Sequence, residues 1–239
     1  MPEKIDRALS RVEKPSRYIG GEVNSYNKKK ETGRGLTFAL AFPDVYEVGM
    51  SHLGIQILYS ILNENSDITA ERVFAPWPDL EERLRAEGEP LCSLESRTPL
   101  AGFDVVGFSL QYELSYTNVL MMLELGGIPL HREKRNEGHP LVIAGGPSAF
   151  NPVPMSSFID AFVIGEGEEA IGEIVDLVKA AKAQGLPDGY YYPLVHCGTS
   201  FGNYKEVRGY LLQSAKLRER VRQILGKLGR LVDGKLLIP

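Results

Sequence analysis

The sequence is short of cysteine, and this limits the metal chemistry expected of the chain alone. Its 239 residues include two cysteines, Cys92 and Cys197, which stand far apart and form no CxxC pair. Zinc sites and iron–sulfur clusters need several thiolate or imidazole ligands at close spacing. We therefore expect no metal held by this chain alone, and the cysteines are predicted to be free thiols of a cytoplasmic protein.

Hydrophobic segments that direct a chain into or across a membrane are also missing. The N-terminal residues, MPEKIDRALSRVEKPS, are charged from the start and have no apolar centre, so they do not resemble an export signal. No apolar run approaches the ~20 residues that span a bilayer. These two absences predict a cytoplasmic protein without a membrane partner.

Several phosphate-binding and catalytic motifs are absent as well. The chain has no GxxxxGK[ST] and no GxGxxG after its first predicted strand, which argues against a P-loop NTPase and a dinucleotide-binding Rossmann domain. It has no GxSxG and no Ser–His–Asp set, which argues against an α/β hydrolase. Because no residue set visible here performs chemistry unaided, the residues alone favour a binding module.

The charge that is present is unevenly distributed. The net charge of −4 gives no reason to expect a nucleic-acid partner. Residues 205–230, however, carry eight basic and two acidic side chains, whereas residues 1–204 carry a net charge of −10. The segment Tyr210–Leu231 is predicted to form a basic amphipathic helix. Packing on its own domain or on a partner is the commoner use of such a helix, and a membrane or nucleic-acid surface is the alternative.

Apolar runs of strand length alternate with helical patterns along the middle of the chain. Such strands, apolar throughout, are typical of a parallel sheet with helices on both faces. Five units in about 150 residues favour a flavodoxin-like, doubly wound α/β fold. The strands are expected at Leu36–Phe42, Arg72–Ala75, Asp104–Leu110, Pro140–Ala144 and Ala161–Ile164.

Helices are expected after four of these strands. The first is predicted to have Ser51 as its N-cap, and the second to start at Asp79 and end at Gly88. The other two are expected at about Leu114–Leu125 and Glu168–Gln184. The segment Leu91–Leu94 is compatible with a short strand or a loop.

This pattern divides the chain into three parts. Residues 1–33 are predicted to be a polar lead-in and linker, residues 34–185 the flavodoxin-like domain, and residues 186–239 a loop followed by the basic helical tail.

Ligands of open parallel sheets bind at the carboxyl ends of the strands, so the loops there are the candidate site. The most informative is Gly145-Gly146-Pro147, since glycines at a strand end allow φ > 0 and a close approach of a ligand. After the last strand, Gly165-Glu166-Gly167-Glu168 adds two more glycines. Its carboxylates could reach ribose hydroxyls or only favour the start of the helix.

Two further loops complete this predicted rim. Ser109-Leu110-Gln111 offers a hydroxyl and an amide, although Ser109 could equally be a small residue where a helix packs closely. Met50-Ser51-His52 lies at a helix start, where backbone N–H groups can bind an anion. A histidine without a ligand role is the commoner reading of His52, because it has no partner residues in the sequence.

Four segments in the same order resemble the N-terminal cobalamin-binding-like domain of radical S-adenosylmethionine (SAM) proteins. They are FPDVYEVGMSHLGIQILYSILNE, GFSLQYELSYTNVL, AGGPSAFNPVP and FVIGEGEEAI, and the upstream RVEKPSRYIGGEVNS is similar to the lead-in of one uncharacterised branch. The resemblance covers about residues 8–185. It implies a flavodoxin-like domain ahead of a barrel whose CxxxCxxC motif holds a [4Fe–4S] cluster and cleaves SAM.

The resemblance implies cobalamin as the ligand, with two departures from the pattern. Cobalamin-binding domains have Asp-x-His-x-x-Gly, Ser-x-Leu and Gly-Gly motifs. Gly145 and Gly146 match the last of these, and Ser109 matches the serine, with Gln111 in place of the leucine. The first motif is absent, so His52 is not expected to be the lower cobalt ligand.

The second departure is the absence of CxxxCxxC anywhere in the sequence. The [4Fe–4S] cluster and SAM would then belong to a missing domain or a separate radical-SAM barrel chain, and this chain is not expected to be catalytic by itself. The leading hypothesis is a cobalamin-binding-like module of a radical-SAM protein. A protein-interaction module and a flavin- or nucleotide-binding domain are the alternatives.

Overall fold

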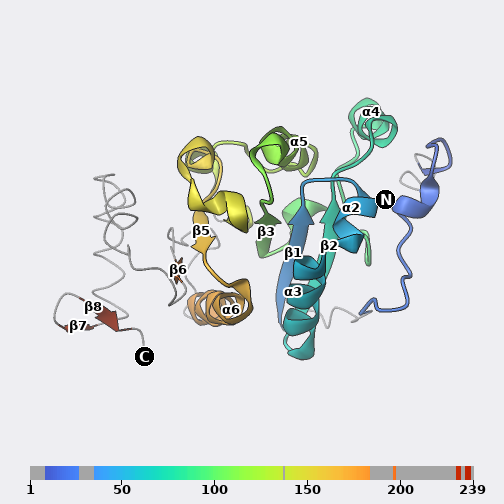
Figure 1. Ribbon diagram of the computed structural model, residues 1–239. Coiled ribbons are helices and arrows are strands. Elements are labelled where there is room, and N and C mark those ends of the chain that lie inside the picture. Colours follow the sequence, from blue (N-terminus) through green and yellow to red (C-terminus); the bar gives the residue numbers. More distant parts are fainter. Residues whose placement is uncertain are drawn as a thin grey trace.

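The computed structural model describes residues 9–26, 35–136, 138–183, 196–197, 230–232 and 235–237. A parallel sheet organises most of them, with strand order β2-β1-β3-β4-β5-β6 (Figure 1). All five strand pairings are parallel. The strands are β1 (Leu36–Phe42), β2 (Ile68–Phe74), β3 (Val105–Ser109), β4 (Leu141–Gly145), β5 (Ala161–Ile164) and the two-residue β6 (His196–Cys197). The predicted flavodoxin-like, doubly wound parallel sheet is confirmed.

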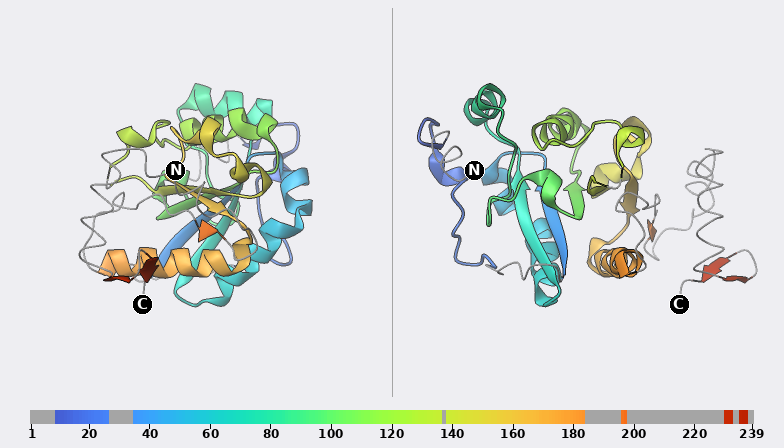
Figure 2. Two further views of the ribbon diagram at one scale, coloured as in Figure 1. Left: turned by 60° about the vertical axis from the view of Figure 1, so that its left-hand side comes forward. Right: turned by 180° about the vertical axis from the view of Figure 1, so that it is seen from behind.

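Helices cover both faces of this sheet (Figures 1 and 2). On one face lie α3 (Leu53–Glu64) and α6 (Gly167–Ala183), and on the other lie α4 (Pro78–Glu87) and α5 (Tyr116–Leu125). Because successive strand side chains point to opposite faces, β1 contributes to both cores. Phe38, Leu40 and Phe42 pack with α3 and α6, while Ala39 and Ala41 pack with α4 and α5.

The remaining helical segments are short. The six-residue α2 (Tyr46–Ser51) follows β1 directly. After β4, two 3₁₀ turns stand where a doubly wound fold usually has an α-helix. The 3₁₀ turns are η1 (Pro15–Arg17), η2 (Leu100–Gly102), η3 (Glu113–Ser115), η4 (Arg132–Lys134), η5 (Pro147–Phe150) and η6 (Val153–Met155).

The start of α3 corrects one prediction. Ser51 is not its N-cap, because it is the last residue of α2, where its hydroxyl donates to the Val48 carbonyl at 2.9 Å. His52 takes that position, and its side chain accepts a hydrogen bond from the Ile55 N–H. The predicted end of α4 is confirmed: Gly88 adopts φ 64°, the left-handed conformation that favours glycine after a helix.

The edge strand β2 begins four residues before the predicted Arg72. Glu71 and Arg72 interrupt its apolar pattern, yet both are buried, at 2% and 0% exposure. The segment Leu91–Leu94 is not a regular strand. It lies along this edge, where the Leu94 N–H donates to the Arg72 carbonyl at 2.8 Å. Within the segment that follows α4, Cys92 forms an isolated antiparallel bridge with Pro99.

The lead-in, residues 9–26, packs against the outside of β2 and α4 (Figure 1). Leu9 and Val12 are buried in the core on the α4 side. The Trp77 N–H, next to α4, donates to the Tyr18 hydroxyl at 3.0 Å. These contacts tie the first part of the chain to the sheet.

Other predicted segments fall largely outside the described residues. These are residues 27–33 of the predicted lead-in and linker, the loop after α6 and most of the basic helix. The last two residues of that predicted helix, Arg230 and Leu231, belong instead to β7 (Arg230–Val232), which pairs antiparallel with β8 (Lys235–Leu237). Within the described ranges, no helix combines the length and apolarity needed to cross a membrane.

Two glycine substitutions in helices should change the free energy of unfolding in opposite directions, because only Gly49 of α2 is packed closely against the sheet. A Cβ at Gly49 would lie 2.3 Å from the Phe74 ring, whereas a Cβ at the exposed Gly172 of α6 meets nothing within 4 Å. Gly49→Ala should lower the free energy of unfolding by about 1–3 kcal/mol because the ring must move. Gly172→Ala should raise it by about 1 kcal/mol through helix propensity. Urea denaturation measures the free energy of unfolding of both variants. An unchanged value for Gly49→Ala would mean that α2 does not pack on Phe74.

Candidate functional site

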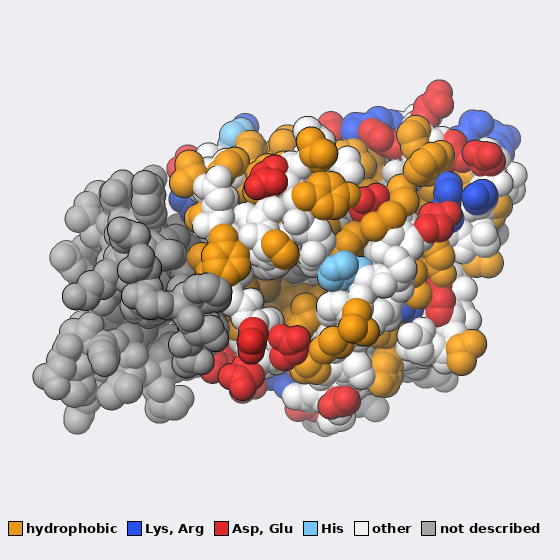
Figure 3. All heavy atoms as spheres, in the orientation of Figure 1, with side chains coloured by type: hydrophobic (Ala, Val, Ile, Leu, Met, Phe, Trp, Pro, Cys, Tyr) orange, Lys and Arg blue, Asp and Glu red, His pale blue; other side chains and the backbone are white. Residues whose placement is uncertain are grey.

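A groove of about 250 Å³ lies between α3, α6 and the sheet, at the carboxyl ends of β1, β3, β4 and β5. Its floor consists of strand side chains facing α3 and α6, namely Phe38, Leu40, Ile143 and Val163. Figure 3 shows a hollow with a hydrophobic floor, bordered by a histidine on one side and acidic side chains on the other. The position is the one at which open parallel sheets bind ligands.

Glycines line the mouth of the groove and allow close packing of the backbone there. Gly146 has φ 98°, and a Cβ there would lie 2.7 Å from the Leu110 carbonyl oxygen. Gly165 has φ 114°, so a side chain would be strained there as well. Gly145 differs, since a Cβ there would make ordinary contact with Val163 at 3.6 Å. Other glycines in the lining are Gly54, Gly107 and Gly167.

Nine of the thirteen predicted site residues line this one groove, although they come from four separate loops. They are His52, Ser109, Gln111, Gly145, Gly146, Pro147, Gly165, Gly167 and Glu168. The loops after β3 and β4 are joined through the backbone, since the Leu110 N–H donates to the Gly145 carbonyl and the Ser148 N–H to the Leu110 carbonyl. The structure thus brings these residues together, and a ligand role for them stays a prediction.

The other four predicted residues do not line the groove. Leu110 is fully buried in the core on the opposite face of the sheet. Met50 belongs to α2, and its sulfur accepts a hydrogen bond from Arg72 at 3.3 Å. Ser51 and Glu166 are exposed outside the groove.

Sequence reasoning missed the apolar part of the lining. Ile55 and Leu58 of α3 and Ile171 and Ile174 of α6 form its two walls. One signal was present at Gly107, a lone glycine inside an apolar strand, which often marks a close approach. A Cβ at Gly107 would lie 2.8 Å from the Phe38 ring.

His52 caps α3 and leaves no ring lone pair for a metal. Its Nδ1 accepts from the Ile55 N–H at 3.4 Å, and its ring lies 5.1 Å from the Phe42 ring centre. With the Nδ1 lone pair so used, a neutral imidazole carries its proton on Nε2. Among the described residues, no group of three or more His, Cys, Asp or Glu side chains is placed to hold a metal ion.

Polar side chains in the groove and in the loops beside it are paired by hydrogen bonds. Gln111 Nε2 donates to Ser109 Oγ at 2.8 Å, which leaves the serine hydroxyl proton available to a ligand. The Tyr112 hydroxyl donates to Asp44, joining the loops after β3 and β1. This hydrogen bond raises the pKa of Tyr112, so the phenol stays protonated at neutral pH.

The described lining contains no Lys or Arg. A ligand phosphate held by these residues would therefore rest on backbone N–H groups and the Ser109 hydroxyl. The acidic residues Glu168 and Glu169, in the first turn of α6, favour the helix through its dipole.

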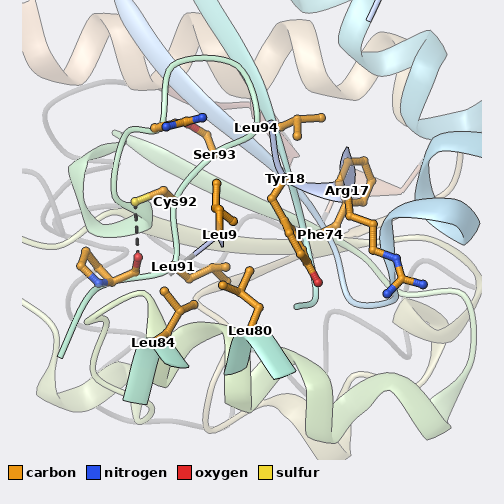
Figure 4. A pocket seen from close by; sticks show the side chains of 12 residues that line it. Leu9, Arg17, Tyr18, Phe74, Leu80, Leu84, Leu91, Cys92, Ser93 and Leu94 are labelled. Atoms are coloured by element: carbon orange, nitrogen blue, oxygen red, sulfur yellow. Dashed lines mark hydrogen bonds between the residues drawn. The ribbon is translucent and has the colours of Figure 1, made fainter. Parts of the chain in front are cut away.

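A second, smaller cavity of about 60 Å³ lies beneath the lead-in (Figure 4). Leu9 and Tyr18 of the lead-in, Leu80 and Leu84 of α4 and the segment around Cys92 line it. Its volume is far below the ~300–1,000 Å³ of ligand pockets. It is a packing seam that holds the lead-in on the domain.

Cys92 in this seam is predicted to be unreactive. Burial raises the pKa of its thiol to about 11, and its Sγ donates to the Pro90 carbonyl at 3.3 Å. At pH 8 the thiolate fraction falls about 200-fold below that of a free cysteine with pKa ~8.5. In a Cys197→Ser background, iodoacetamide should label Cys92 slowly in the folded protein and rapidly in urea. Fast labelling of the folded protein would contradict the raised thiol pKa at this half-buried position.

The family model for radical SAM proteins, N-terminal, matches residues 54–191, more than half of the chain. The chain belongs to this family. The match begins in α3 and includes the groove walls and the glycine loops after β4 and β5.

Two further comparisons are weaker. An uncharacterised protein of Methanocaldococcus jannaschii is 24% identical over 131 residues. The match covers 54% of this chain and 24% of that protein, so the chain spans about a quarter of its relative's length. A crystal structure of a candidate transcriptional regulator from Clostridium difficile 630 aligns with a TM-score of 0.30 and 13% identity, over 84% of this chain and 59% of that one. That likeness is too slight to support an argument.

Proposed function

We propose that this radical SAM N-terminal domain is a cobalamin-binding-like module, with the nucleotide tail of cobalamin in the groove between α3 and α6. The [4Fe–4S] cluster and SAM would be held by a radical-SAM barrel, adjoining or separate, because the present sequence has no CxxxCxxC. The observation that carries the proposal is that nine of the residues predicted from the sequence, in four separate loops, line one groove with glycines at its mouth.

The groove suits a ligand tail better than a whole ligand. Its volume of about 250 Å³ lies just below the ~300–1,000 Å³ usual for complete small molecules. The apolar floor suits a flat base, and Ser109 with the backbone N–H groups suits a ribose and a phosphodiester. Bound cobalamin would supply the cobalt chemistry, and the chain's own part is to hold and orient it.

The corrin ring would then lie outside the groove, over the rim. Several apolar side chains are exposed there, including Leu53 at 72%, Leu114 at 87% and Phe150 at 51%. His52 would not be a cobalt ligand, because its Nδ1 lone pair accepts the hydrogen bond that caps α3. Binding without a protein imidazole agrees with the absence of the Asp-x-His-x-x-Gly motif.

Filling the groove tests the proposal. Gly145→Leu places a side chain on the groove face of β4 without strain, whereas Gly146 is a poor probe because its φ of 98° demands glycine. The purified protein should retain about one hydroxocobalamin per chain after desalting, as read from the visible spectrum. Gly145→Leu should weaken retention about tenfold or more, a loss of about 1.4 kcal/mol.

Gly172→Leu is the matched control, since it makes the same change on the exposed side of α6. It should retain the corrin. Retention by a folded Gly145→Leu protein would place the ligand elsewhere. Binding of flavin mononucleotide in place of the corrin, visible from its different spectrum, would favour the flavin alternative.

A protein-interaction module is the second candidate, and the exposed apolar rim is the observation that favours it, because such patches often mark interfaces. Leu53→Lys combined with Leu114→Lys separates the two uses. If the rim supports a corrin, this double variant should bind hydroxocobalamin several-fold more weakly, whereas Val23→Lys on the lead-in should not. Unchanged corrin retention in the double variant would favour a protein partner as the ligand of the rim.

A further inference from the structure

The helix α2 needs support from outside itself. It has six residues, its N-cap Val45 makes no side-chain hydrogen bond, and it contains Gly49. A helix this short is not stable alone in water. Its position matters to the groove because it ends at Ser51, directly before His52, which caps α3 and lines the groove.

The lead-in supplies two contacts to α2. Arg17 Nε donates to Glu47 Oε1 at 2.7 Å, and the Arg17 guanidinium lies 4.7 Å above the Trp77 ring. The Tyr46 hydroxyl donates to Glu22 Oε1 at 2.9 Å. Burial, together with this hydrogen bond, raises the pKa of Tyr46 to about 12, so the phenol remains a donor at neutral pH.

A third connection runs through the buried Arg72. Glu22 Oε2 accepts from Arg72 Nη2 at 3.3 Å, while Arg72 Nη1 donates to Met50 Sδ at 3.3 Å and to Gln56 Oε1 at 3.4 Å. Gln56 Nε2 in turn donates to the Met50 carbonyl at 3.2 Å. Glu22 of the lead-in therefore acts on both ends of α2, at Tyr46 directly and at Met50 through Arg72.

We propose that the lead-in is a positioning element of the groove, with Glu22 and Arg17 holding α2 so that His52 stays in the groove wall. The order of residues 17–26 and the occupancy of the groove are then coupled. The family match begins at Gly54, so the lead-in and α2 lie outside the matched region, whereas Gln56 and Arg72 lie inside it. The proposal rests on the proposed function only for the choice of ligand used in its test.

Coupling of this kind is reciprocal. If ligand binding requires α2 in place, a bound ligand must stabilise the lead-in by the same free energy that the lead-in contributes to binding. A segment that merely stabilised the fold would not respond to the groove. Amide hydrogen exchange of residues 17–26, with and without ligand, therefore separates positioning from general stabilisation.

Tyr46→Phe is the test variant, because it deletes the hydrogen bond to Glu22 and keeps the ring whose centre lies 5.6 Å from that of Phe74. Tyr18→Phe is the matched control. It also deletes one hydrogen bond of the lead-in, but that bond leads to the Trp77 N–H beside α4 and not to α2. Both tyrosines are half-buried.

We expect hydroxocobalamin to slow amide exchange of residues 17–26 in the unmodified protein. Tyr46→Phe should speed exchange of residues 46–52 about fivefold and weaken hydroxocobalamin binding about fivefold, the lower end of usual coupling. Tyr18→Phe, whose lost bond does not touch α2, should leave exchange of residues 46–52 unchanged and weaken binding less than Tyr46→Phe does. Equal weakening by the two variants, or by neither, would overturn the proposal.

Failure of the proposed function would look different. If the unmodified protein binds no hydroxocobalamin, the cobalamin hypothesis falls while the positioning role is still decided by the ligand-free protein. Faster exchange confined to residues 46–52 in Tyr46→Phe supports the positioning role, and unchanged exchange there refutes it.

Discussion

The buried guanidinium of Arg72 is the constraint on which the arrangement of this edge of the molecule depends. Its side chain is fully buried on β2, with Glu95 Oε1 at 2.7 Å, Glu22 Oε2 at 3.3 Å and the Tyr59 ring centre at 4.3 Å. A buried charge that loses a partner costs about 3–5 kcal/mol. The lead-in, helix α3 and the segment that follows α4 must therefore assemble around β2 together. The same assembly covers an edge strand that would otherwise expose unpaired backbone groups.

The glycines of the groove solve a different problem. A parallel sheet with apolar strands fills the space above each strand with side chains unless small residues keep it open. Gly107 leaves room for the Phe38 ring, and the positive φ of Gly146 and Gly165 turns the chain sharply at two strand ends. The result is an apolar recess at the carboxyl edge of the sheet, bounded by rigid elements on three sides. Such preorganisation lowers the entropy cost of binding a flat ligand.

The sequence predicted the fold and the rim of the groove better than it predicted the interior. Apolar runs and glycines at strand ends are local signals, so the parallel sheet and the loops of Gly145 and Gly165 could be found. The floor could not, because strands that are apolar throughout do not reveal which face a residue such as Ile143 occupies. The start of β2 was hidden by Glu71 and Arg72, whose burial depends on partners distant in sequence. For the same reason α2 was not anticipated, since its support comes from the lead-in.

The charge of the groove lining bears on the ligand proposed for it. The described lining has no cationic side chain, and Glu168 stands at its mouth. A terminal phosphate monoester carries close to two negative charges at neutral pH and would depend heavily on backbone N–H groups. A phosphodiester within a larger molecule carries one charge, which a hydroxyl and a few N–H groups can satisfy. The electrostatics of these residues thus suit an internal phosphodiester better than a terminal phosphate monoester, which supports the proposed cobalamin-like ligand over a free mononucleotide.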